Sequence, residues 1–248
     1  MAGKPQPKIK GHSIRYPKWS EDADRLILYA DFMGFTSRVL SNSHKDIKEE
    51  LMLFRSKWSS KIEPLKSGDH LQFVQFSDSI LIVANGTDFK MFNLLTKAAI
   101  SLVHASMSMR IPIKGVIAQG VFSYDRVNEL YFGKPLIDAY LLHEQLKYYG
   151  IVVHHTAEKT VKKFQDMDNP YYNSPIFLDK GITSHYHLCW NLINVHLHSE
   201  DITNQCKTWI ETIAENVSGT PRMYIDKTLE VLKRDQRLSK TEDDSDKS

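Results

Sequence analysis

The sequence predicts an α+β fold, with one sheet built around a split βαβ motif and helices packed on one face of that sheet. Short apolar runs bounded by turn residues alternate with longer stretches of helical periodicity, in the order β-α-α-β-β-α-β-α-β. The 248 residues are 42% hydrophobic and 25% charged, as expected of a globular chain with one large domain. No apolar run approaches the roughly 20 residues that a membrane helix needs, so no membrane association is expected.

The first strand is expected over residues 25–31, a continuous apolar run that ends on Asp31 and predicts burial on both faces. Helical periodicity then begins at 35–40 and continues over 44–62, where the apolar residues fall on one stripe. Two short strands follow and flank the turn FSDS, which carries Asp78. These strands are expected at 70–76 and 80–84, and the next helix, rich in Leu, Ala and Met, at 88–109.

The second half continues with a strand that contains KGVIAQG and ends with two helices separated by SGTPRM. In chain order we expect a strand at 111–122, a helix at 135–149, strands at 151–154 and 186–197, and helices at 202–214 and 222–238. We therefore divide the chain into a flexible N-terminus (1–18), a main domain (19–200), C-terminal helices (201–237) and a charged, disordered tail (238–248).

Composition argues against several classes of function. The net charge of +2 does not indicate a protein that coats nucleic acid. The basic N-terminus lacks the apolar core of a secretory signal, so we expect a cytoplasmic protein with reduced thiols at Cys189 and Cys206. The two cysteines show no metal spacing. The pairs His185/His187 and His196/His198 show strand alternation, but these histidines, together with His154 and His155, lack the four-ligand spacing of a closed zinc site.

Two carboxylates mark a candidate cation site. Asp31 ends the first strand and Asp78 lies in the turn of the following hairpin, so pairing of these strands brings both acids to one edge of the sheet. Two carboxylates that lie close together repel each other, and a hard cation such as Mg²⁺ or Mn²⁺ prefers such oxygen ligands. The plain alternative is that both aspartates are ordinary turn and cap residues.

The residues after Asp31 suggest a phosphate site beside that cation. Gly34 lets the backbone approach a ligand closely, and the chain then enters a helix whose first N–H groups have no partner inside the helix. Such a helix start binds phosphate oxygens, helped by the helix dipole. The stretch from Phe32 to Thr36 therefore predicts a cradle for a metal-bound triphosphate.

Three segments resemble the class III nucleotidyl cyclases, the adenylyl and guanylyl cyclase family. YADFMGFTSR resembles the first metal-binding segment, FVQFSDSILIV the second metal-binding hairpin, and YFGKPLIDAY the glycine segment that leads into the interface helix. The similarity covers roughly residues 24–160, and Ser77 stands where the family usually has glycine. The resemblance implies a ferredoxin-like βαββαβ core and a homodimer or pseudodimer with active sites at the interface.

The resemblance also implies a reaction and a set of site residues. A 3′-hydroxyl attacks the α-phosphate of a nucleoside triphosphate, pyrophosphate leaves, and two divalent cations, Mg²⁺ or Mn²⁺, assist. By this resemblance Asp31, Asp78 and the carbonyl of Phe32 hold the ions. The amides of Gly34, Phe35 and Thr36 hold phosphate.

Four positions depart from the ordinary cyclases. The purine-reading lysine and aspartate of the family fall on Val74 and Leu130, which cannot read a base edge by side-chain hydrogen bonds. The family's asparagine and arginine that steady the transition state fall on Ile137 and Leu141. The chain is therefore either a non-catalytic cyclase-like module or a cyclase with another base and another cation, for which Arg38 and Lys114 are the candidates.

KGVIAQG, YFGKPLIDAYLLHEQL and the compact chain without sensor domains resemble the pyrimidine cyclases of Pycsar antiphage systems. This resemblance implies that UTP, or CTP, becomes cyclic UMP, or cyclic CMP, when phage infect the cell. The cyclic nucleotide then acts on a separate effector protein that kills or arrests the cell. Two alternatives remain: a purine cyclase with an unusual pocket, and a non-catalytic nucleotide-binding or dimerisation module.

Overall fold

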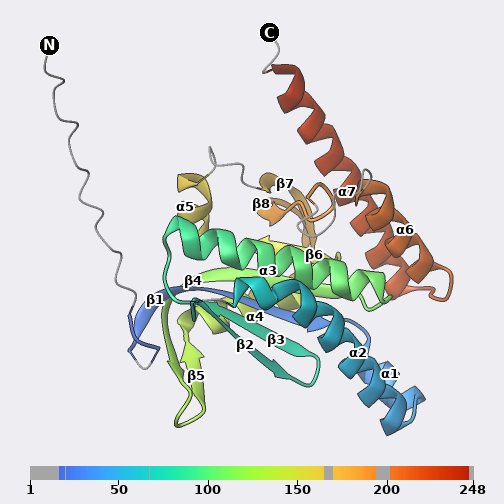
Figure 1. Ribbon diagram of the computed structural model, residues 1–248. Coiled ribbons are helices and arrows are strands. Elements are labelled where there is room, and N and C mark those ends of the chain that lie inside the picture. The colour runs from blue at the N-terminus through green and yellow to red at the C-terminus, as the bar shows by residue number, and fades with distance from the viewer. Residues whose placement is uncertain (1–16, 20, 67, 165–169, 194–201, 246–248) are drawn as a thin grey trace, which may run out of the picture.

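The computed structural model describes residues 17–19, 21–66, 68–164, 170–193 and 202–245. Its elements, in chain order, are β1 (Ala23–Phe32), α1 (Phe35–Ser41), α2 (His44–Ile62), a 3₁₀ turn (Glu63–Leu65), β2 (Leu71–Phe76), β3 (Ser79–Ala84), α3 (Phe89–Ser108), β4 (Ile113–Asp125), β5 (Leu130–Gly133), α4 (Lys134–Gln145), β6 (Gly150–Val153), α5 (His155–Lys163), β7 (Tyr171–Leu178), β8 (Gly181–Leu188), α6 (Ile202–Ala214) and α7 (Thr220–Ser245) (Figure 1).

One mixed sheet organises the described part of the chain. Its strands run in the order β2-β3-β1-β4-β6-β8-β7, and β5 folds back onto β4. The strands from β1 to β4 are antiparallel to their neighbours and give the order β2-β3-β1-β4, which is the ferredoxin-like arrangement of a βαββαβ unit. The sheet then extends through β6, which is parallel to β4. The α+β class and the βαββαβ core agree with the sequence prediction.

Helices cover both faces of the sheet, which corrects the prediction of a single covered face. Alternate residues of β1, such as Leu26 and Leu28, pack with α2 and α3 in one core, and Figure 1 shows these two helices crossing the sheet. Ile27 instead joins a second core with Ala139 and Leu142 of α4. Because side chains alternate along a strand, the two cores lie on opposite faces. The continuous apolar run of β1 gave no sign of which helix would lie on which face.

Three elements were missed by the sequence patterns. Strand β5 has only four residues, and α5 follows β6 directly after its cap His154. Strand β7 contains Pro175, which normally argues against a strand. β7 is the last strand in the order of the described sheet, with β8 as its neighbouring strand, and proline is tolerated at such an edge position. The strand expected at 186–197 is instead β8, which ends at Leu188, and residues 194–197 lie outside the described residues.

The C-terminal helices pack against the main domain and share its hydrophobic core. Helix α7 presents one buried stripe to the sheet side: Tyr224, Ile225, Thr228, Val231, Leu232 and Asp235. The helix continues to Ser245, so residues 238–245, for which the sequence predicts disorder, are helical. Once packing has nucleated a helix, each further residue adds one hydrogen bond, and no glycine or proline interrupts this end. The flexible N-terminus expected at 1–18 lies almost wholly outside the described residues.

No helix in the described ranges is long and apolar enough to cross a membrane.

Candidate functional site

The structure brings Asp31 and Asp78 together at one end of the sheet. Asp31 is the cross-strand partner of Ser79, the first residue of β3, and Asp78 directly precedes Ser79. The amide of Phe32 donates to the carbonyl of Asp78 over 3.2 Å, which fixes the hairpin turn against the end of β1. Both aspartates line a cavity of about 370 Å³. The prediction that the strand-end acid Asp31 and the turn acid Asp78 lie at one edge of the sheet is therefore confirmed.

The two carboxylates have few protein partners. The Tyr29 hydroxyl donates to Oδ2 of Asp31 over 2.6 Å, whereas Oδ1 of Asp31 is buried without a hydrogen-bond partner. Burial and this hydrogen bond raise the pKa of Tyr29, so the phenol stays protonated and keeps donating. No ion pair within the described ranges uses either aspartate. A buried carboxylate oxygen without a partner is costly, and a bound cation satisfies it.

The backbone after β1 forms the other wall of the cavity. Gly34 has φ of +74°, a left-handed conformation that glycine adopts without a steric penalty, and it caps α1. The amides of Phe32 and Met33 are used, the latter by the carbonyl of Pro112 at 2.7 Å. No backbone hydrogen bond of the described residues uses the amides of Gly34, Phe35 or Thr36, and all three residues line the cavity. The three residues for which the sequence predicts phosphate binding therefore lie beside the two acids, with N–H groups that the backbone of the described residues does not use.

The hairpin turn itself is strained. Ser77 has φ of +57°, in the left-handed region that disfavours residues with a Cβ atom. This conformation explains physically why a glycine would suit this position. The strained residue directly precedes Asp78, so the turn conformation sets where that carboxylate lies.

The two candidate cations lie in different places. Lys114 is the cross-strand partner of Asp31 and lines the cavity, but its buried ammonium donates to the carbonyls of His143 and Leu146 at the end of α4, each at 3.2 Å. Burial, with Lys147 nearby, lowers the pKa of Lys114 to about 8. Lys114 therefore anchors α4 to β4 at the floor of the cavity.

Arg38 does not line the carboxylate cavity. Its guanidinium forms an ion pair with Glu50 of α2 and lines a separate cavity of about 640 Å³ between α1 and the α6–α7 connection. The structure therefore gives no support to Arg38 as the cation that acts on the substrate.

Sequence reasoning missed four residues that line the carboxylate cavity: His143, Glu144, Lys147 and Tyr224. Lys147 is half-buried and makes only a long side-chain contact, 3.5 Å from Nζ to the carbonyl of Glu144. Lys147 follows α4 in the segment LKYYG, and its position just after a predicted helix was the one sequence feature that could have marked it as a site residue. Tyr224 comes from α7, and its hydroxyl donates to the carbonyl of Leu146 over 3.1 Å. No local pattern could have placed Tyr224 here.

The positions that differ from ordinary cyclases lie away from the acids. Val74, on β2, packs at the rim of the core on the α4 face. Leu130 on β5 and Ile137 and Leu141 on α4 expose more than half of their surface. None of these four residues lines the carboxylate cavity of its own chain.

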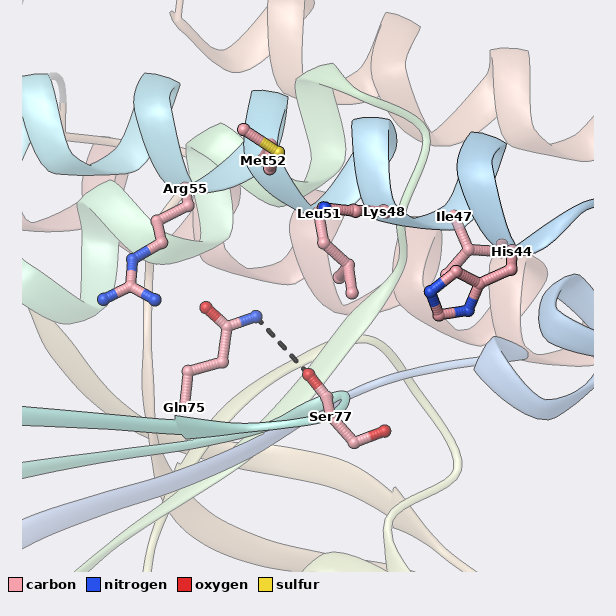
Figure 2. Close-up of a pocket in the computed structure, with 8 residues that line it drawn as sticks. All are labelled: His44, Ile47, Lys48, Leu51, Met52, Arg55, Gln75 and Ser77. Atoms are coloured by element: carbon pink, nitrogen blue, oxygen red, sulfur yellow. Dashed lines mark hydrogen bonds between the residues drawn. The ribbon is translucent and has the colours of Figure 1, made fainter.

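A third hollow lies beside the β2–β3 turn. This groove, of about 350 Å³, runs between α2 and β2, and Figure 2 shows side chains of both elements facing it. Lys48 and Arg55 line it, together with Gln75, whose amide donates to the carbonyl of Ser77. Neither Asp31 nor Asp78 lines this groove. This groove is lined by basic side chains without an acidic one, whereas the carboxylate cavity is lined by both acids and lysines.

The fold can be compared with known structures. No family model matches the sequence, and no curated protein matches it. The catalytic core of a rhodopsin-guanylyl cyclase with converted specificity, solved with ATPαS, superposes with a TM-score of 0.52 at 14% identity over 67% of this chain and 96% of that one. The dimeric guanylyl cyclase domain of the RhoGC fusion protein from the aquatic fungus Blastocladiella emersonii superposes with a TM-score of 0.52 at 14% identity, over 66% of this chain and 95% of that one. The protein therefore has the fold of class III nucleotidyl cyclase domains.

Proposed function

We propose that the protein is a metal-dependent nucleotidyl cyclase that converts UTP, or CTP, to the 3′,5′-cyclic monophosphate and pyrophosphate. The observation that carries the proposal is the pairing of two carboxylates lacking cationic partners with three unused backbone amides in one cavity. This combination offers oxygen ligands to hard cations and N–H donors to phosphate oxygens.

Each residue of the cavity has a role in this proposal. Asp31, Asp78 and the Phe32 carbonyl hold two divalent cations, which when bound neutralise phosphate charge and lower the pKa of the attacking hydroxyl. Tyr29 fixes the orientation of Asp31 through its hydrogen bond. The amides of Gly34, Phe35 and Thr36 receive the phosphate oxygens.

Cationic help comes from Lys147 rather than from Arg38. The Lys147 ammonium faces the cavity with one weak protein contact, whereas the Arg38 guanidinium is held by Glu50 elsewhere. Lys114 is a positioning residue, because its donors are used by the carbonyls that end α4.

We further propose a homodimer in which each active site is completed by the other chain. Strands β4 and β5, the turn between them and helix α4 carry a set of exposed large apolar side chains: Val121, Val127, Leu130, Phe132, Ile137, Tyr140 and Leu141. An extensive apolar surface of this kind favours association with a complementary surface. Sedimentation should give a dimer, and Leu141→Glu should give a monomer with little cyclase activity. A fully active monomer would contradict this part of the proposal.

The preference for a pyrimidine rests on Val74 and Leu130. An apolar wall leaves the polar edge of a purine without partners, at a cost of roughly 1–3 kcal/mol per unpaired group. Uracil before cytosine, and a role as a second messenger for a separate effector in antiphage defence, rest on the sequence resemblance alone. A purine cyclase is the second candidate, because guanylyl cyclase domains share the fold.

One experiment tests the proposal directly. The protein is incubated with Mn²⁺ and equal concentrations of ATP, GTP, CTP and UTP, and cyclic products and pyrophosphate are measured. Cyclic UMP or cyclic CMP as the main product supports the proposal. Cyclic AMP or cyclic GMP as the main product would leave the cyclase but overturn the pyrimidine preference. Nucleotide binding without any cyclic product would identify a non-catalytic module.

A further inference from the structure

A second polar cluster lies inside the protein, away from the carboxylate cavity. It consists of His187 of β8, Cys189 directly after β8 and Asp235 of α7, each at most 1% exposed. Nε2 of His187 lies 2.6 Å from Oδ1 of Asp235, and Sγ of Cys189 lies 3.8 Å from the same nitrogen. One donor atom from each of the three residues lies within 4.8 Å of the other two. We call these residues the buried triad.

One hydrogen-bond acceptor of the buried triad is left unused by the protein. Oδ2 of Asp235 has no hydrogen-bond partner, and Asp235 is fully inaccessible to solvent. The hydroxyl of Tyr148 is also buried without a partner, and burial, with the charges of Asp235 and Cys189 nearby, raises its pKa. A carboxylate with one unpaired oxygen in a sealed interior is costly, so something of positive charge is expected beside it.

The donor set identifies the class of ligand. A thiolate, an imidazole and a carboxylate are the ligands of Zn²⁺, and a soft sulfur donor argues against Mg²⁺ or Ca²⁺. With a neutral imidazole, one thiolate and one carboxylate balance the two positive charges of the ion, so the sealed site is neutral. Asp235 offers two oxygens, which gives four donor atoms from three residues. We propose that the buried triad is a structural zinc site that fastens α7 to the sheet.

The surroundings of His187 fit this assignment. Nδ1 of His187 lies 3.5 Å from the hydroxyl of Ser174 on β7, so the ring can donate to Ser174 while Nε2 binds the ion. His187 is also held in the sheet, as the cross-strand partner of Val152 on one side and Tyr172 on the other. The ligand thus comes from a rigid strand with a second partner for its other nitrogen. Zinc-bound histidines usually have both features.

The position of the site explains what a zinc ion would do. Asp235 is the last buried residue of the α7 stripe among the side chains that the structure describes, and the same helix supplies Thr228 to the amide of Tyr149 and Tyr224 to the carbonyl of Leu146. The zinc would hold α7 at one end, and Tyr224 lines the carboxylate cavity at the other. Because the ion binds the folded state only, its affinity adds to folding stability.

Metal analysis of the protein tests the proposal. The chain is purified without a histidine tag and without chelator, and zinc is measured by elemental mass spectrometry. We expect about one zinc per chain in the wild type, and loss of zinc in Cys189→Ser and Asp235→Asn. Cys206→Ser is the matched control, since Cys206 is equally buried but lies on α6 outside the triad. Asp31→Asn with Asp78→Asn should keep its zinc, which separates this site from the proposed active site.

A second measurement avoids any misfolded variant. Removal of zinc from the wild type with a strong chelator should lower the melting temperature, and added Zn²⁺ should restore it. A wild-type protein that contains no zinc, takes up none when Zn²⁺ is offered, and melts at the same temperature with chelator would overturn the proposal. The triad would then be a metal-free ion pair between His187 and Asp235.

Discussion

The carboxylate cavity and the buried triad are both polar clusters built around aspartate, but they differ in access and in donor chemistry. Asp31 and Asp78 face an open cavity, among backbone amides and two lysines. Asp235 is sealed between β8 and α7, with an imidazole and a thiol. The first arrangement is open to solvent, whereas the second is closed to it.

The difference shows how aspartate suits two kinds of cation site, one that meets a substrate and one that holds two elements together. A cation that must meet a substrate needs hard oxygen ligands and free coordination positions, which an open cavity provides. A cation that holds two elements together needs a closed shell, and a sulfur ligand selects an ion that is held tightly. Replacing an aspartate should therefore lower activity at the carboxylate cavity and lower stability at the buried triad.

The largest effect is expected at the carboxylate cavity. Asp31→Asn or Asp78→Asn should lower cyclase activity by at least about 100-fold, because each removes a metal ligand. The melting temperature should not fall, because no protein cation loses a partner. Product formation and thermal unfolding are measured together, with Asp179→Asn in an exposed turn as control. Either variant with near-normal turnover would refute the assignment of its carboxylate.

The next effect is expected at the buried triad and should be one of stability. Asp235→Asn should cost roughly 3 kcal/mol of unfolding free energy, because it breaks a fully buried charged cluster. Urea unfolding measures this loss, with Asp226→Asn on the exposed side of the same helix as control. If Asp235→Asn were as stable as the wild type, the comparison between an open and a closed cluster would fail.

A smaller pair of effects should separate the two lysines of the cavity. Lys147→Met should raise the KM for the nucleotide about 10-fold, equal to ~1.4 kcal/mol, because a charged donor to phosphate is lost. Lys114→Met should instead lower stability by roughly 1–3 kcal/mol, because two carbonyls at the end of α4 lose their donor. Steady-state kinetics and urea unfolding of both variants test this, and reversed results would exchange the two roles.

The smallest effect concerns the strained turn. Ser77→Gly should raise the unfolding free energy by roughly 0.5–1 kcal/mol, because glycine adopts the left-handed conformation without a Cβ clash. Turnover should stay within about twofold of the wild type, since Asp78 keeps its place. Ser79→Gly, in the extended first position of β3, should destabilise and serves as control. A destabilised Ser77→Gly would show that the turn carries no strain.

The parts of the site that the sequence predicted depend on local order. Asp31 and Asp78 could be found because a strand end and the turn of a hairpin that pairs with that strand are set by short-range pattern. The helix at 44–62 was predicted with the bounds that α2 has, because its apolar stripe lies within the segment itself. Pattern and pairing rules suffice for such features.

The parts that were missed depend on how distant segments pack. Tyr224 reaches the cavity, and Asp235 reaches His187, only because α7 lies against the sheet, and nothing in the sequence of α7 says which surface it will cover. Arg38 was a reasonable candidate by position, but Glu50 on α2 turns it away. Pro175 concealed β7 because its tolerance depends on an edge position that topology alone decides.

Tyr224 of α7 lines the carboxylate cavity, so the cavity is completed only late in translation of the chain. The two acids and the phosphate cradle lie in the first third of the chain, so the ribosome delivers them early. Helix α7 is synthesised after all of these segments, and until then the cavity lacks one side and α4 lacks the bond from Tyr224 to Leu146. A nascent or prematurely terminated chain therefore carries the acids without a finished cavity. The proposed cyclase activity would therefore require that translation proceed through α7.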